Sequence, residues 1–204
     1  VVRSRGLGDV YKRQDKNIEK LKIYENNNQI NDVFFSMSHG VNRGKLKRDK
    51  QDERHNFITD LITECPNIIF DIYGYNNREP VWAEDFYKVI VNSKMALNLT
   101  RGKPLKYLTS NRIASLIGNG LLTFIDKRTQ LSNFFNGNEV IFYSGLEDLA
   151  NKINFYKSND KKRINVAKKG RRKYFDLFEC QKVANYIISK SFNREISKKL
   201  KWMD

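Results

Sequence analysis

The chain has 204 residues and a formal net charge of +15, a length that allows one sizeable domain and a charge that favours anionic partners. Its 40% hydrophobic and 12% aromatic residues exclude a disordered chain, and no run approaches the roughly eighteen apolar residues of a membrane span. With no visible signal peptide and two cysteines in no metal or redox spacing, we expect a cytoplasmic protein, with peripheral contact at the inner membrane face left open.

Residues 1–14 show neither a capped helix pattern nor strand alternation. They resemble a translated adapter read-through of the kind found at the ends of some assembled environmental sequences. We therefore expect an artefact here and a reading frame truncated at its N-terminus. Because the segment carries four basic residues and one acidic residue, the rest of the chain keeps a net charge of +12. Residues 15–31 are polar and rich in asparagine, as in a linker.

From residue 32 onward, apolar strand patterns alternate with amphipathic helix patterns. The expected strands are 32–38, 68–73, 95–100, 121–125 and 139–143. The expected helices are 49–64, 82–93, 110–118, 131–135, 146–156 and a helical tail at 175–192. This alternation predicts an α/β domain with a parallel sheet, right-handed crossovers and helices on both faces.

Three loops at the carboxyl ends of the expected strands carry glycine or cations. The first includes Gly40, Arg43 and Lys45, the second begins at Gly74, and the third is the basic loop 101–107. Glycine lets the backbone approach a ligand, and the cations can bond phosphate oxygens. The first loop alone is equally consistent with an ordinary basic surface loop after a strand. Their convergence at one edge of the sheet favours an anion site.

The stretch from Thr109 to Asp126 predicts a helix that leads into a buried strand. Thr109 or Ser110 can cap the helix, and residues 118–120 can end it because glycine and asparagine tolerate positive φ. The free N–H groups and positive dipole end near the start of the helix form an anion site, for which phosphate is the expected ligand.

Residues 161–173 hold eight Lys or Arg residues and no acidic residue. Such a run is typical of a solvated helix face, and anionic lipid or nucleic acid are the alternative partners. Nucleic acid is the least favoured, because the chain has no recognition-helix motif, zinc ligand set or ribonucleoprotein signature.

Four segments, in this order and spacing, resemble the group 1 glycosyltransferases, and in particular their spore-protein-like branch. They are the runs 110–113, 118–126, 134–143 and 146–149. The resemblance extends over about residues 32–192. It implies the C-terminal, nucleotide-sugar-binding half of a GT-B enzyme, in which two Rossmann-like domains face a cleft and no metal is obligatory.

The resemblance also implies details of the fold. We expect a Rossmann-like three-layer domain over 32–192 with strand order 3-2-1-4-5, followed by a basic tail at 193–204. In GT-B enzymes the tail helix crosses back onto the first domain. We therefore expect Tyr186, Ile187 and Phe192 to be partly exposed in this chain.

Carried over position by position, the resemblance implies contacts to the donor diphosphate from the first loop and the start of the helix. These residues are Gly40, Arg43, Lys45, Ser110, Asn111 and Arg112, with His39 and Arg101 as further candidates. The departing diphosphate gains charge as the glycosidic bond breaks, so fixed donors aimed at it lower the barrier. No metal and no cofactor is implied, since the nucleoside-diphosphate sugar is a substrate.

For the nucleoside, the resemblance implies Tyr75 near the base and Ser115 near the ribose. The family commonly has a glutamate at the second position, which accepts from the ribose hydroxyls, whereas serine is shorter and neutral. An ordinary helix residue is the alternative interpretation of Ser115. No paired carboxylates and no Ser-His-Asp or Cys-His arrangement support a hydrolase, and we assign no catalytic residue.

The expected function is therefore that of the donor-binding domain of a glycosyltransferase. The expected partners are a nucleotide sugar, a glycan or lipid-linked acceptor of the cell-surface or polysaccharide type, a missing N-terminal domain and an anionic membrane surface. This chain alone is expected to be inactive. The alternatives are a non-catalytic nucleotide-binding module, favoured by Ser115 and the missing domain, and a basic nucleic-acid-binding domain, supported by charge alone.

Overall fold

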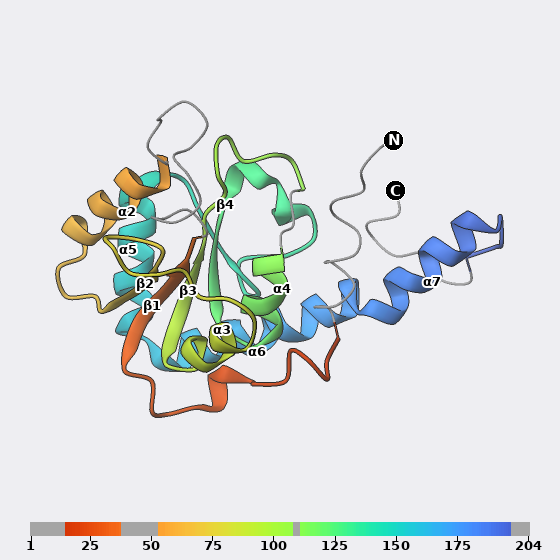
Figure 1. Ribbon diagram of the computed structural model, residues 1–204, viewed down its shortest axis with the longest axis horizontal. Coiled ribbons are helices and arrows are strands. Elements are labelled where there is room, and N and C mark those ends of the chain that lie inside the picture. Colours follow the sequence, from red (N-terminus) through yellow and green to blue (C-terminus); the bar gives the residue numbers. More distant parts are fainter. Residues whose placement is uncertain (1–14, 38–52, 108–110, 197–204) are drawn as a thin grey trace.

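A five-stranded, all-parallel sheet forms the centre of the protein (Figure 1). The computed structural model describes residues 15–37, 53–107 and 111–196. In spatial order the strands run β2-β1-β3-β4-β5. Their bounds are β1 Asn31–Ser36, β2 Phe70–Tyr73, β3 Ser93–Asn98, β4 Leu122–Asp126 and β5 Ile141–Tyr143. Because both faces of the sheet are covered, the centres of the strands are apolar and buried, as in Val33 to Phe35 of β1 and Met95 to Leu97 of β3.

The expected α/β class is confirmed, and the strand order differs from 3-2-1-4-5 in the place of the third strand. That order put the third strand at an edge, whereas β3 lies between β1 and β4, with Met95 opposite both Val33 and Leu122. Five of the six residues of β3 are buried. Met95, Ala96 and Leu97 point to both faces in turn and are fully buried, which suits a strand in the middle of the sheet rather than at an edge, where one side lacks a neighbour.

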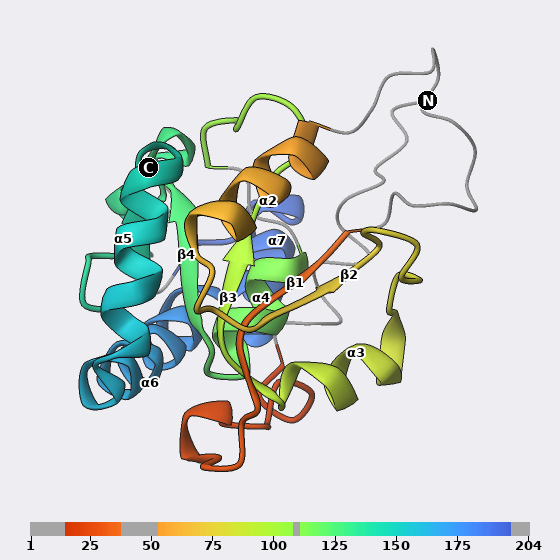
Figure 2. The same ribbon diagram turned by 90° about the vertical axis from the view of Figure 1, so that its left-hand side faces the viewer.

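Helices cover both faces of the sheet (Figure 2). One layer contains α2 (Glu53–Glu64) and α5 (Gly145–Lys157), and the other contains α3 (Ala83–Ile90) and α4 (Asn111–Gly118). The long helix α6 (Asp160–Phe178) serves both layers. Its middle packs into the core on the α2 and α5 side, and its last turns pack with α4 on the other side.

The segment expected to be a linker packs against α4 and α6. It contains the short helix η1 (Ile23–Glu25), and Ile23 is buried and donates its N–H to the carbonyl of Asn119 over 2.7 Å. The carboxylate of Glu19 is buried and accepts a hydrogen bond from the side-chain amide of Asn119. Arg171 of α6 closes the arrangement by donating to the carbonyls of Glu19 and Gly118 over 3.0 and 2.8 Å.

The expected tail helix is two helices. Helix α6 continues to Phe178, and α7 (Cys180–Ser191) begins after Glu179, whose extended ψ of 136° breaks the helical path. Helix α7 has no buried residue and extends away from the body of the domain (Figure 1). As expected, Tyr186 and Ile187 are partly exposed and Phe192 is 67% exposed.

Helix α6 packs tightly against the backbone of Glu139 at Gly170. A Cβ atom on this residue would lie 2.1 Å from the carbonyl oxygen of Glu139. We expect Gly170→Ala to lower the free energy of unfolding by about 2–3 kcal/mol, because the backbone contact cannot yield without moving the helix. Denaturant unfolding measures this change.

Gly137→Ala is the matched control, since a Cβ atom there meets no heavy atom within 4 Å. We expect it to change the free energy of unfolding by less than about 0.5 kcal/mol. Equal stability of the two variants would contradict the packing of α6 described above.

Candidate functional site at the carboxyl edge of the sheet

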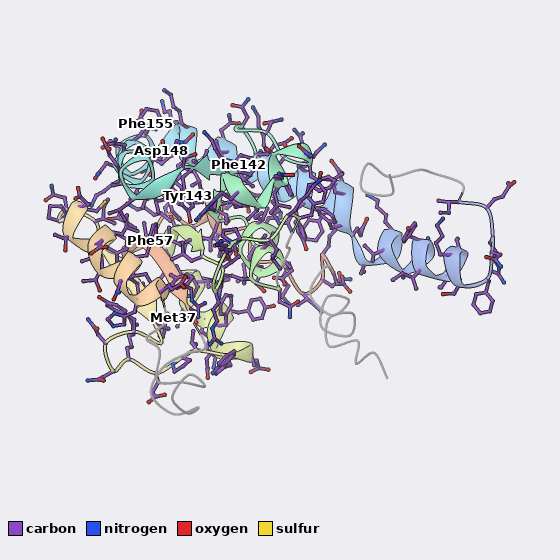
Figure 3. All side chains as sticks on the ribbon, turned by 90° about the horizontal axis from the view of Figure 1, so that it is seen from above. Met37, Phe57, Phe142, Tyr143, Asp148 and Phe155 are labelled. Atoms are coloured by element: carbon purple, nitrogen blue, oxygen red, sulfur yellow. The ribbon has the colours of Figure 1, made fainter. Side chains whose placement is uncertain are left out.

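The carboxyl ends of β3, β4 and β5 and the start of α2 surround a pocket of about 130 Å³. Its lining residues are Glu53, Arg54, Phe57, Leu99, Thr100, Gly102, Pro104, Asp126, Arg128 and Tyr143. Two of them, Phe57 and Tyr143, are labelled in the view from above, and their ring centroids are 6.4 Å apart (Figure 3). The pocket therefore has an apolar wall and a rim of opposite charges.

An ion pair fixes the β4 side of this pocket. Asp126 ends β4 and accepts the backbone N–H of Arg128 at the start of the short helix η2 (Lys127–Thr129). The guanidinium of Arg128 bonds both carboxylate oxygens of Asp126, with distances of 2.6 to 3.1 Å. The Arg128 side chain is 72% exposed, whereas the Asp126 side chain is 10% exposed. A buried carboxylate therefore holds an exposed guanidinium in place. The carboxylate raises the pKa of Arg128 through this hydrogen bond.

The hydroxyl of Tyr143 stays neutral at this edge. Burial raises its pKa, and the negative charge of Asp126 raises it further. A neutral phenol can both donate and accept a hydrogen bond. Tyr143 thus adds a polar group without charge to the wall of the pocket.

The basic loop 101–107 is docked on the segment that follows β4. The N–H of Tyr107 donates to the carbonyl of Thr129 over 2.8 Å, and its hydroxyl accepts from the side-chain amide of Asn133 over 2.6 Å. Asn133 ends the short helix η3 (Leu131–Asn133), and the ring of Tyr107 lies 5.1 Å from that of Phe134. These contacts hold the loop, including Arg101, beside the pocket.

The start of α4 is fixed above the ends of the central strands. Arg112 donates from Nη1 to the carbonyl of Leu99 over 2.7 Å, and its guanidinium lies 4.9 Å from the ring centroid of Phe35 in β1. The N–H groups of the first helical turn have no partner within the helix. The structure therefore places Asn111 and Arg112 at the carboxyl edge, and their role toward a diphosphate stays a prediction.

Two further predicted residues lie away from the pocket. Ser115 is 1% exposed on α4, with its hydroxyl 3.5 Å from Oε1 of Glu19. Tyr75 shares a 2.9 Å hydrogen bond with Thr59 of α2, and its ring lies 4.6 Å from that of His55. Neither residue lines the pocket. Their roles toward ribose and base stay predictions.

The predicted residues of the first loop and the helix cap fall outside the residues that the structure describes. These residues are His39, Gly40, Arg43, Lys45 and Ser110. Their assignment to a donor diphosphate also stays a prediction.

Several residues of the edge were not predicted. Arg128 could have been noticed as a cation two residues after the aspartate that closes β4. Asn98 could have been noticed as a polar residue near the end of an apolar strand. Phe57 gave no signal, because its place on the apolar face of α2 is typical of core residues.

Residues 15–37, 53–107 and 111–196 contain no helix that is long and apolar enough to cross a membrane. Nor do these ranges contain three or more His, Cys, Asp or Glu residues grouped so that they could hold a metal ion.

The chain can now be compared with known proteins. Residues 50–189 match the family described as Glycosyl transferase-like, and the chain belongs to this family. The crystal structure of Alr3699/HepE from Anabaena in complex with UDP is similar to the chain, with a TM-score of 0.62 and 12% identity over 92% of this chain and 53% of that one. The crystal structure of Alr3699/HepE in complex with UDP and glucose has a TM-score of 0.58 and 12% identity over 92% and 52%.

These comparisons confirm the resemblance to glycosyltransferases and the expected fold class, an α/β domain of the GT-B type. The chain spans about half the length of the solved structures that it matches. No curated protein matches it.

We expect Asp126→Asn to lower the free energy of unfolding by about 1 kcal/mol, because the amide keeps one acceptor for the N–H of Arg128 and loses the charge that holds the guanidinium. Denaturant unfolding of this variant, of Arg128→Ala and of the double variant gives the coupling energy. We expect about 0.5–1 kcal/mol, and less in 1 M salt.

The pair formed by Asp148 and Lys152 on α5 is the control, since it joins two side chains of similar exposure over 2.7 Å. Its coupling energy is expected to be about 0.3–0.5 kcal/mol. A coupling energy for Asp126 and Arg128 below that of this surface pair would mean that the burial of Asp126 does not strengthen its ion pair.

Proposed function

We propose that this chain is the donor-binding domain of a GT-B glycosyltransferase that acts on a nucleoside-diphosphate sugar. The observation that carries the proposal is the start of α4, which Arg112 fixes above the carboxyl ends of β1 and β3. A helix N-terminus at this edge of a parallel sheet suits a phosphate group. The family match and the similarity to a protein crystallised with UDP and with glucose support this proposal.

The proposed chemistry needs positive charge where the diphosphate departs. The N–H groups at Asn111 and Arg112 supply fixed dipoles, and Gly40, Arg43 and Lys45 supply the loop that neutralises the phosphates. Such preorganised donors lower the barrier because they need not reorient as charge develops. In this proposal the protein cations take the part that a metal ion takes in other transferases, so transfer needs neither metal nor cofactor.

The acceptor is proposed to be a glycan or a lipid-linked sugar of the kind used in polysaccharide assembly, bound with the help of a second domain. The chain spans about half of the solved structures that it resembles. Its helix α7 has no buried residue, and Ile188 and Phe192 are 46% and 67% exposed. An apolar helix face of this kind suits packing against that second domain.

Helix α6 is proposed to rest on an anionic membrane. Lys161, Lys162, Lys168 and Arg172 are all exposed and recur along one side of the helix. Lys162 lies 4.8 Å from the ring of Phe155, which is 43% exposed, so an apolar side chain accompanies the cations. Cations together with an exposed aromatic ring suit a bilayer of anionic lipid better than they suit a purely polar polyanion.

A non-catalytic nucleotide-binding module is the second candidate function. Ser115 stands where the family commonly has the ribose-binding glutamate, and its hydroxyl faces Glu19 on the buried side of α4. Both candidate functions predict nucleotide binding. They differ in that only the glycosyltransferase predicts sugar transfer when the chain is joined to a second domain.

We expect calorimetric titration of the chain with uridine, guanosine, thymidine and adenosine diphosphates to show saturable binding of one of them. Arg43→Ala is expected to weaken that binding about tenfold, because a charge-assisted hydrogen bond to a phosphate oxygen is lost. Lys161→Ala removes a cation on α6 instead and should leave the affinity unchanged. A folded chain that binds none of the four nucleotides would overturn the proposed donor site.

For the membrane proposal, we expect the chain to sediment with vesicles that contain about 30% anionic lipid and to stay free of neutral vesicles, because each cation near such a surface adds about 1 kcal/mol. Changing Lys161, Lys162, Lys168 and Arg172 to Gln should lower the partition coefficient at least tenfold.

A second variant serves as the charge-matched control, with Gln at four exposed lysines on other elements, Lys22, Lys88, Lys103 and Lys127. It should lose much less binding than the α6 variant. Equal losses would show a response to net charge alone. Salt-dependent binding to DNA without binding to anionic vesicles would favour nucleic acid instead.

A further inference from the structure

The side chain of Asn98 is buried at the carboxyl end of the central strand without a partner. Asn98 is 2% exposed and ends β3. Among the residues that the structure describes, neither its Oδ1 nor its Nδ2 has a hydrogen-bond partner. A buried amide with both ends unsatisfied is rare, because each end loses its bonds to water and gains none.

Asn98 lies on the side of the sheet that carries α4. Successive side chains of a strand point to opposite faces, so Asn98 shares a face with Ala96, which packs with residues of α3 and α4. Phe34 of β1 pairs with Ala96, and two residues further along these strands come Ser36 and Asn98. Both strands thus carry a polar residue at the carboxyl end of this face, Ser36 on β1 and Asn98 on β3.

The local geometry ties this amide to the proposed donor site. The residue after Asn98 is Leu99, whose carbonyl accepts from Arg112 in the first turn of α4. Thr100, one residue further, lines the pocket. Asn98 is therefore adjacent in the chain to Leu99 and two residues from Thr100, and both of these residues lie at the carboxyl edge.

We propose that Asn98 binds a pair of hydroxyl groups of the donor, and this inference rests on the proposed function. The amide offers one acceptor and two N–H donors, and neither end has a partner among the described residues. A phosphate would satisfy the N–H donors and leave Oδ1 unpaired, because its oxygens only accept. Hydroxyl groups both donate and accept, so two neighbouring hydroxyls satisfy the whole amide. The ribose and the transferred sugar both carry such a pair.

Asn98→Val tests the inference, because it removes both polar atoms while keeping a similar volume and a residue that strands favour. We expect the melting temperature of the ligand-free chain to rise by about 3 °C, since an unpaired buried group is removed. We expect affinity for the hydroxyl-bearing ligand to fall about tenfold or more, since the hydroxyls then lose their partner. Asn98→Ala provides a second variant if valine does not fit.

Ser93 provides the control within the same strand. Its hydroxyl is also buried and unpaired among the described residues, and it lies at the amino end of β3. Ser93→Ala should leave nucleotide affinity unchanged. An equal loss of affinity in this variant would show that any change in β3 disturbs the site, and would overturn the specific role of Asn98.

The probes are UDP, 2′-deoxy-UDP and UDP-glucose, titrated against the full chain and each variant. If the ribose supplies the hydroxyls, Asn98→Val lowers the affinity of the chain for UDP and removes its preference for UDP over 2′-deoxy-UDP. If the transferred sugar supplies the hydroxyls, Asn98→Val leaves the affinity for UDP unchanged. It then removes the amount by which UDP-glucose binds more tightly than UDP. Either result supports the inference.

Two results would overturn the inference while the proposed function stands, provided that the unaltered chain binds UDP. One is unchanged affinity for all three probes in Asn98→Val. The other is a fall in melting temperature in both Asn98 variants, which would reveal a structural partner for the amide. If the unaltered chain binds no nucleotide at all, the proposed function fails and this inference fails with it.

Discussion

The burial of a parallel sheet on both faces is the constraint on which the rest of this structure depends. Parallel strands bring all their carboxyl ends to one edge, and the covering helices leave that edge as the place where loops and polar groups collect. Asp126, Tyr143 and Asn98 all lie where a buried strand ends. Their chemistry follows from this position, since each polar group is held by an apolar strand and shielded from water by the layers beside it.

The sequence predicted the elements well where apolar periodicity is strong. The strands at 121–125 and 139–143 and the helix at 146–156 correspond closely to β4, β5 and α5. Strand order was harder to predict, because it depends on pairing between strands that are distant in the sequence, and Met95 to Leu99 resembles the other strands in its apolar character. The linker at 15–31 was also difficult to interpret, since the contacts of Glu19 and Ile23 lie about a hundred residues away in the sequence.

The site was predicted in part for a similar reason. Asn111 and Arg112 reach the carboxyl edge because a helix that follows a parallel strand must begin there. Three features of the site could not be read from any local sequence pattern, because they depend on tertiary structure. They are the hydrogen bond from Arg112 to Leu99, the ion pair of Asp126 with Arg128, and the amide of Asn98, which has no partner among the described residues. Ser115 shows the converse, because its match to a family position did not reveal that its hydroxyl would face Glu19.

Helix α4 is tied at both of its ends. Arg112 holds its start to the end of β3, and Asn119, just past its last residue, is bonded to Glu19 and to the backbone of Ile23. A short helix that is hydrogen-bonded at both ends cannot shift along its axis without breaking hydrogen bonds at one end or the other. Residues 19–23 therefore hold one end of α4, and the other end lies at the carboxyl edge of the sheet, about twelve ångströms away for eight helical residues at about 1.5 Å each. The segment before the sheet thus contributes to the position of the helix whose start lies at that edge.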